Sequence, residues 1–149
     1  IFSLNLVWGF RFMKHYLVYF AAVYSFALLL LGILFSLLNL NTSISIPTLI
    51  AAGFITAGHF VKREQRRPSD DERIQLIWSC TITSLIITSL VLFFYSLLSP
   101  AASNILNVIK STNIILIAIM MMLLILVHAA VFFVSFGWYA NRCAQKLNV

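Results

Sequence analysis

Long apolar runs alternate with short polar segments along this chain. Four runs contain no Asp, Glu, Lys or Arg, and they cover residues 16–38, 46–61, 74–98 and 113–139. At a rise of 1.5 Å per residue, the first run forms a helix of about 35 Å, longer than the roughly 30 Å hydrocarbon core of a bilayer. The pattern therefore predicts an all-α membrane protein, with four transmembrane helices packed as an antiparallel bundle.

The second run, residues 46–61, is the shortest of the four. It can reach across by recruiting Ser43 and Lys62, or the bilayer can thin around it. Pro47 fits the first turn of a helix, where its missing N–H is not needed. A re-entrant hairpin is the alternative for this run, and the placement of charge bears on that choice.

Charge is concentrated between the second and third runs. Residues 62–73 read Lys-Arg-Glu-Gln-Arg-Arg-Pro-Ser-Asp-Asp-Glu-Arg, with basic side chains first and acidic ones second. This order places cations at the end of one helix and anions at the start of the next, which complements both helix dipoles. Ser69 and Glu72 have the spacing of a capping box. Four cations of this loop are expected to face anionic lipid headgroups: Lys62, Arg63, Arg66 and Arg67.

The basic residues indicate which side of the membrane the loop occupies. With four spans, every one of the ten Lys and Arg residues except Lys110 falls on the side of the loop. The positive-inside rule then puts the loop and both termini in the cytoplasm. If the second run did not cross, Arg142 and Lys146 would lie opposite the loop and would weaken this bias. Charge therefore favours four spans.

Composition excludes a water-soluble domain. Apolar residues make up 62% of the chain and charged residues 9%, against roughly 45–50% and 25% in soluble domains. The net charge of +6 does not indicate nucleic-acid binding, because the cations flank apolar runs and lack the interleaved aromatic residues of such sites. A bilayer with anionic headgroups is the expected partner.

Residues 1–12 precede a pair that resembles a natural start, Met13 and Lys14, which the first apolar run follows. We expect residues 1–12 to be an N-terminal extension whose presence in the native protein is not assumed. Residues 13–149 are then expected to form a single transmembrane domain.

The spans offer few side chains that could carry chemistry. No acidic side chain lies in any run, which disfavours the proton-coupled drug exchange of small four-helix exporters. His128 is the titratable side chain near the middle of the fourth run. It can relay protons or bind a ligand, but a neutral His bonded to a neighbouring helix is favoured. The candidate polar site within the membrane is His128 with the hydroxyl groups of Thr81, Ser84 and Thr88.

Neither a metal nor another cofactor is expected. His59 stands at the loop end of the second run, about 15 Å from His128 in depth, which is too far for two ligands of one haem. Cys80 and Cys143 do not form a C-x-x-C pair, and both are expected to be packing residues.

Small residues recur on one face of each of the first two runs. Gly53 and Ala57 are four residues apart with Gly58 beside them, and Gly32 belongs to a similar face of the first run. Such faces let helix backbones approach closely inside a membrane. These four residues are expected to pack helices within the bundle. The alternative is that one face is left over for a homodimer or a partner protein.

The second run and the loop after it carry two short motifs. Residues 45–53 read Ser-Ile-Pro-Thr-Leu-Ile-Ala-Ala-Gly, residues 58–62 read Gly-His-Phe-Val-Lys, and an Arg-Pro pair follows in the loop. With the Met-Lys start and a Tyr-rich first run, they resemble a family of small four-helix inner-membrane proteins of Acinetobacter and related bacteria. The resemblance implies a bacterial inner membrane and a family without an established catalytic activity. No functional residue of this chain is assigned from the resemblance.

These observations predict a non-enzymatic inner-membrane protein that supports envelope homeostasis, as a homo-oligomer or as an accessory subunit. The alternative is a transporter or channel for a small or lipophilic solute, with His128 and the hydroxyl face of the third run lining the path. A membrane enzyme acting on lipid or quinone is the weakest class, because no acid or nucleophile stands beside His15 or His59 in sequence.

Overall fold

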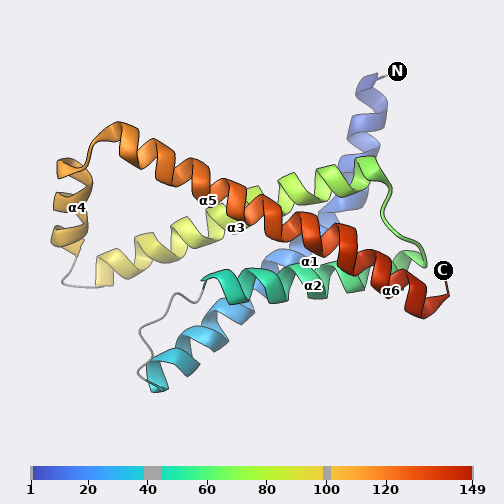
Figure 1. Ribbon diagram of the computed structural model, residues 1–149, viewed down its shortest axis with the longest axis horizontal. Helices are drawn as coiled ribbons and strands as arrows, with labels where there is room; N and C mark the ends of the chain where they lie inside the picture. Colours follow the sequence, from blue (N-terminus) through green and yellow to red (C-terminus); the bar gives the residue numbers. More distant parts are fainter. Residues whose placement is uncertain (1, 39–44, 99–101, 149) are drawn as a thin grey trace.

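The computed structural model describes residues 2–38, 45–98 and 102–148, and every element within these ranges is helical. In chain order the elements are α1 (Phe2–Leu37), α2 (Ser45–Glu64), α3 (Asp70–Leu98), α4 (Ala102–Ser111), α5 (Ile114–Val134), the π-helical turn η1 (Ser135–Tyr139) and α6 (Ala140–Leu147) (Figure 1). The last three follow one another without a break and form one long helix. The predicted all-α fold is confirmed in these ranges.

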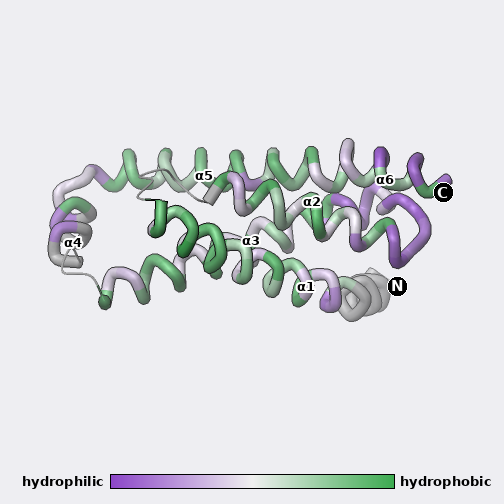
Figure 2. The backbone as a smooth tube through the Cα atoms, turned by 90° about the horizontal axis from the view of Figure 1, so that it is seen from below, coloured by the Kyte–Doolittle hydropathy of each residue, from purple (hydrophilic) through white to green (hydrophobic). Residues whose placement is uncertain are grey.

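Among the described residues, three segments are long and apolar enough to cross a membrane: Met13–Leu37, Asp70–Leu98 and Ile114–Leu147. They contain nearly all of the first, third and fourth predicted runs, while the second run lies in α2. Figure 2 shows hydrophobic residues along the middle of the molecule and hydrophilic ones at its two ends. One polar end holds the α2–α3 loop and α6, and the other holds α4. This is a membrane protein with transmembrane helices.

Helix α4 is an element that the sequence pattern did not predict. It begins at Ala102, between the third and fourth predicted runs; residues 99–101 lie outside the described part of the chain. Asn113 then caps α5, because its side-chain oxygen accepts a hydrogen bond from the N–H of Ile115 at 3.0 Å. At the other end of the chain, α1 begins at Phe2, so residues 2–12 continue the first helix without a break.

The connection between α2 and α3 has the predicted capping box. The Ser69 N–H donates to the Glu72 carboxylate at 2.9 Å, and the Glu72 N–H donates to the Ser69 hydroxyl at 3.4 Å. Helix α2 ends at Glu64, and the next residue, Gln65, has a φ of 52° in the left-handed region. Cations occupy the last turn of α2 and anions the first turn of α3, as the dipole argument predicts.

Apart from Pro68 in the α2–α3 loop, the buried residues of the described chain lie in one half of the molecule. This packed half consists of residues 13–24 of α1, 48–61 of α2, 76–84 of α3 and 128–144 of α5 to α6. The open half consists of residues 26–38 of α1, 89–98 of α3 and 114–127 of α5, and it contains no buried side chain. In Figure 1, α1 diverges from the other helices in the open half, and α4 joins the separated ends of α3 and α5.

Helix α2 has a fixed direction relative to its neighbours. It runs antiparallel to α1, since the Tyr19 ring stacks on His59 at 4.1 Å and the Tyr16 ring lies 4.9 Å from Phe60. It runs parallel to α5 and α6, because Gly53 packs against Ser135 while the Phe54 ring stacks on Tyr139 at 4.5 Å.

Candidate functional site

His128 lies on α5 at the boundary between the packed half and the open half. Its side chain is only 4% exposed, and it is the first buried residue of α5 in chain order. The Nδ1 atom lies 2.8 Å from the carbonyl oxygen of Leu124, one turn earlier in the same helix. Because a carbonyl oxygen can only accept, Nδ1 carries the proton and Nε2 is left as an acceptor. Nε2 has no hydrogen-bond partner among the residues that the structure describes.

The hydroxyl groups of α3 do not bond to His128, which corrects the expected pairing. Thr81 donates to the Ile77 carbonyl at 2.7 Å, and Ser84 donates to the Thr81 carbonyl at 2.9 Å. The Thr88 hydroxyl instead lies 3.0 Å from the hydroxyl of Tyr24 on α1. Ser and Thr on a helix can bond to the carbonyl three or four residues earlier, and this local bond competes with partners on other helices.

Aromatic side chains fill the packed half close to His128. Phe132 stands one turn after it and is completely buried. The Phe132 ring meets Phe20 edge-on at 5.3 Å, and Phe20 stacks on Tyr24 at 5.6 Å. His128 therefore has an apolar wall on the side of the packed half, with no acid or metal-binding cluster. Among the described residues, no group of three His, Cys, Asp or Glu side chains could hold a metal ion.

Two of the four predicted packing residues, Gly53 and Gly58, lie at the contact of α2 with η1. A Cβ atom added to Gly53 would lie 2.7 Å from the Ser135 hydroxyl, so only glycine fits there without a shift. Ala57 is fully buried, and a Cβ on Gly58 would lie 3.7 Å from the Tyr139 ring. Gly32 differs, because a Cβ placed there would have no described atom within 4 Å.

The π-helical turn η1 was not predicted from the sequence. Its residue Ser135 donates a hydrogen bond to the Val131 carbonyl at 2.8 Å, and Gly137 is buried against Arg73 of α3. Single π-helical turns inside α-helices are often found at functional sites. The signal that could have located it is the pair of small residues, Ser135 and Gly137, within a run of large apolar ones.

The predicted headgroup cations divide into two kinds. The Arg66 guanidinium forms two 2.8 Å hydrogen bonds with the carboxylate of Glu72, and these bonds raise the pKa of Arg66. Arg63 lies over the Tyr16 ring at 5.9 Å. Lys62 and Arg67 are exposed, so they can reach lipid headgroups. Sequence reasoning missed a neighbouring contact, in which the Tyr16 hydroxyl donates a hydrogen bond to Glu64.

Cys80 is buried within the packed half and Cys143 is half-buried in α6; neither forms a disulfide.

Comparison with family models, curated protein sequences and solved structures finds no match to this chain. The fold and the geometry of the side chains are therefore the basis for a functional proposal.

Proposed function

We propose that this protein is a non-enzymatic subunit of the bacterial inner membrane that assembles with further transmembrane helices through its open half. It joins copies of itself or serves as an accessory subunit of a larger complex, and in this way supports envelope homeostasis. One observation carries the proposal. The three helix segments of the open half bury no side chain, whereas the packed half has a core from four helices.

Helix α1 supports assembly through the open half more strongly than its neighbours do. Gly32 has open space where a side chain would be, and Ser36, one turn later, is exposed. In lipid, apolar side chains gain little by meeting a helix instead of acyl chains, so association depends on close backbone approach at small residues. Gly32 and Ser36 allow such an approach on α1.

The proposal includes four spans, with the α2–α3 loop and both termini in the cytoplasm. Helix α2 packs against α1 and against η1 within the packed half, and these contacts support α2 as the fourth span. Its 20 residues rise about 30 Å, the thickness of the hydrocarbon core. The excess of cations on the loop side supports the orientation.

Disulfide crosslinking in native membranes tests the assembly. In a background with Cys80→Ala and Cys143→Ala, Ser36→Cys places a thiol on the open half of α1. Ala22→Cys is the matched control, since it is exposed on α1 within the packed half. Under mild oxidation we expect a covalent dimer from Ser36→Cys and none from Ala22→Cys if the protein joins copies of itself.

Native mass spectrometry of the protein extracted gently from its membrane covers the accessory case. A second, different polypeptide bound to the chain supports an accessory subunit. A single monomer mass, together with no crosslink at Ser36→Cys above the level of Ala22→Cys, would overturn assembly in both forms.

Thiol labelling in intact cells tests the orientation separately. We expect a membrane-impermeant reagent to label Lys110→Cys and to leave Lys62→Cys unlabelled until the membrane is opened. Labelling of both cysteines in intact cells, or of Lys62→Cys alone, would contradict the proposed topology.

Solute transport is the second candidate function, and one observation favours it. The Nε2 atom of His128 is buried and has no partner among the described residues. An imidazole nitrogen with an available lone pair can accept and pass on a proton, as a relay group does. Proteoliposomes with an entrapped pH dye test this: the parent should conduct protons and His128→Ala should not. Absence of flux in both proteins would rule the transport function out for protons.

A further inference from the structure

Two apolar grooves flank α5 alongside the packed half. The larger groove, of about 510 Å³, lies between α3 and α5. Its walls include Ile77 and Trp78 from α3 and Ala129 and Phe133 from α5. The smaller groove, of about 300 Å³, lies between α2 and α5 and is lined by Ile50, Phe54 and residues of α5. Both volumes suit a small-molecule ligand.

The two grooves adjoin along a low ridge of α5. Ala130 and Val134, one turn apart, line both grooves. The ridge leads on to Trp138 and Arg142, each four residues further along, and the Arg142 guanidinium lies 4.8 Å over the Trp138 ring. Trp138 is exposed, and tryptophan is enriched at the depth of lipid headgroups. The ridge therefore runs from an apolar pair of grooves to a cationic end.

Arg73 stands at the loop end of the larger groove and is held in place. Its guanidinium lies 4.3 Å over the Phe133 ring, which lines the groove. A Cβ added to Gly137 would lie 3.3 Å from the Arg73 Cζ atom, so the guanidinium also packs against the backbone of η1. In the described part of the chain no carboxylate lies within ion-pair distance of Arg73; the salt bridge there joins Arg66 to Glu72.

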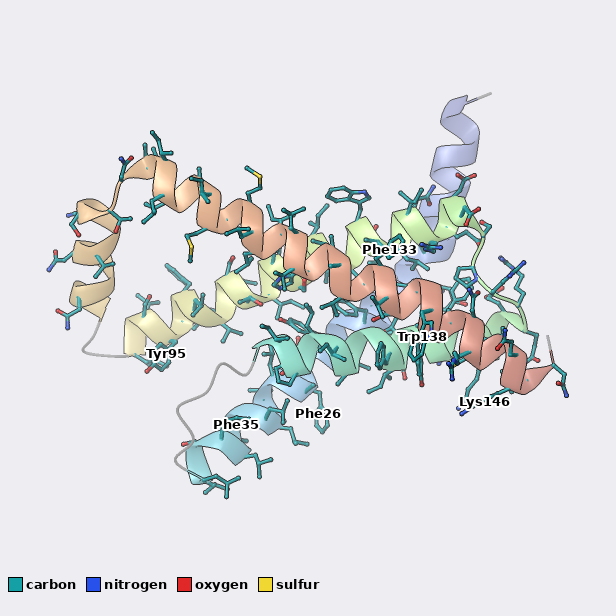
Figure 3. All side chains as sticks on the ribbon, viewed as in Figure 1. Phe26, Phe35, Tyr95, Phe133, Trp138 and Lys146 are labelled. Carbon is teal, nitrogen blue, oxygen red and sulfur yellow. The ribbon has the colours of Figure 1, made fainter. Side chains whose placement is uncertain are left out.

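We propose that one anionic phospholipid, from the leaflet that borders the α2–α3 loop, binds astride α5. Each groove takes one of its two acyl chains, and its phosphate lies between Arg73 and Arg142. Two adjoining grooves fit a diacyl lipid, and the two guanidinium groups complement the charge of its phosphate. From Ala130 to Arg142 the helix rises about 18 Å, close to one leaflet with its headgroup. Figure 3 places Phe133 and Trp138 on the same stretch of this helix.

This lipid site goes beyond the proposed assembly and does not depend on it. Apart from Leu126, the residues that line the grooves lie outside the open half, which assembly uses. A protein that fails to oligomerise can still bind the lipid, so the two proposals fail separately.

The first test measures headgroup preference in the full chain. Purified protein is incubated with equal amounts of phosphatidylglycerol and phosphatidylcholine that carry the same acyl chains, and bound lipid is counted by native mass spectrometry. Choline supplies its own cation to the phosphate, so phosphatidylcholine gains less from arginine. We expect phosphatidylglycerol in about tenfold excess on the protein, as for a charge-assisted bond. Equal retention of the two lipids would overturn the proposal.

Two pairs of variants locate the site. Arg73→Gln should remove most of the preference, while Lys14→Gln, which removes one positive charge from an exposed position on α1, should keep it. Ala130→Leu should lower retention of both lipids several-fold by filling both grooves, while Ala118→Leu, exposed on the open half of α5, should leave it unchanged.

Other outcomes of these variants count against the site. An equal loss in Lys14→Gln and Arg73→Gln would indicate diffuse attraction to the basic surface and overturn the phosphate position. Unchanged retention in Ala130→Leu would overturn the acyl-chain position. Where Arg73→Gln does not fold, Arg142→Gln on the exposed rim takes its place, with the same expected loss of preference.

Discussion

Phe132 and Phe26 are both phenylalanines within long apolar helices, yet one is fully buried and the other is 66% exposed. The same contrast separates the packed half from the open half throughout. Tyr24 in the packed half is buried and bonded to Thr88, whereas Tyr95 in the open half is 61% exposed. Figure 3 labels Phe26 and Tyr95 on the separated helices. Hydrophobicity alone therefore does not decide which helix faces meet.

Close approach and polar contacts distinguish the packed half. Gly53 lets α2 reach Ser135, and Tyr16 and Tyr24 donate or share hydrogen bonds between helices. In the described open half, the side-chain hydrogen bond of Ser96 goes to a carbonyl of its own helix. Inside a membrane, van der Waals packing and interhelical hydrogen bonds are what hold helices together. Matched substitutions in the packed half and the open half test this difference in helix packing.

The largest difference is expected from the two phenylalanines. Phe132→Ala leaves a cavity among Phe20 and its neighbours and should lower the free energy of unfolding by about 3 kcal/mol. Phe26→Ala removes a side chain that packs little and should change it by less than about 0.5 kcal/mol. Unfolding by sodium dodecyl sulfate, followed by circular dichroism, measures both. Similar losses in the two variants would show that both halves are packed in the membrane.

The two glycines should respond in opposite directions. Gly53→Ala forces Ser135 away and should cost about 1–2 kcal/mol through overpacking. In the monomer in detergent, Gly32→Ala meets open space and should stabilise the chain by about 0.5–1 kcal/mol, because alanine favours helix. The same unfolding assay reports both. A loss at Gly32→Ala that depends on protein concentration would instead point to assembly at this glycine.

His128 lies where the two halves meet, and its replacement should be stabilising. His128→Leu removes a buried acceptor without a described partner and should raise the free energy of unfolding by about 1 kcal/mol. His59→Leu is the control, since His59 is half-buried and stacked on Tyr19 and should lose stability. A loss of stability in His128→Leu would mean that Nε2 has a partner in the membrane.

The smallest effect is expected at the surface of the packed half. Glu72→Gln breaks the ion pair with Arg66 but keeps a side chain that can complete the capping box. Because the pair is partly exposed, the loss should be below about 1 kcal/mol and should shrink in high salt. Asp71→Asn, also in the first turn of α3, is the control for the helix dipole. A loss of unfolding free energy in Glu72→Gln as large as that in Phe132→Ala would contradict the expected order of effects.

The sequence predicted best those features that depend on neighbours within one helical turn. The four helical runs follow from apolar length, and the capping box follows from the spacing of Ser69 and Glu72. Both depend on contacts between residues three or four apart, which a sequence displays directly. Among the small residues, Gly53 was assigned to helix packing, and its contact with Ser135 agrees with that role.

Features that depend on how helices cross were harder to predict. The sequence predicts the hydroxyl groups of Thr81 and Ser84 as partners of His128, but each hydroxyl donates a hydrogen bond to a carbonyl oxygen of its own helix. Gly32 and Gly53 have similar sequence surroundings, but of the two only Gly53 meets another helix, because the later part of α1 diverges from the other helices (Figure 1). The contact of Arg73 with Phe133 is also not predictable from the sequence, because this contact depends on η1 bringing Gly137 close to α3.

The π-helical turn η1 also bears on how this chain can change in length. A π-helical turn holds one residue more than the α-helical turn that it replaces, and one residue turns an α-helix by about 100°. Deleting one residue within 135–139 therefore converts η1 to α-helix and keeps the faces of α5 and α6 in phase. The same deletion within α5 itself would rotate everything beyond it, and Arg142 would leave the side of the helix that carries Val134. At η1 this long helix can therefore lose one residue without reorienting α6.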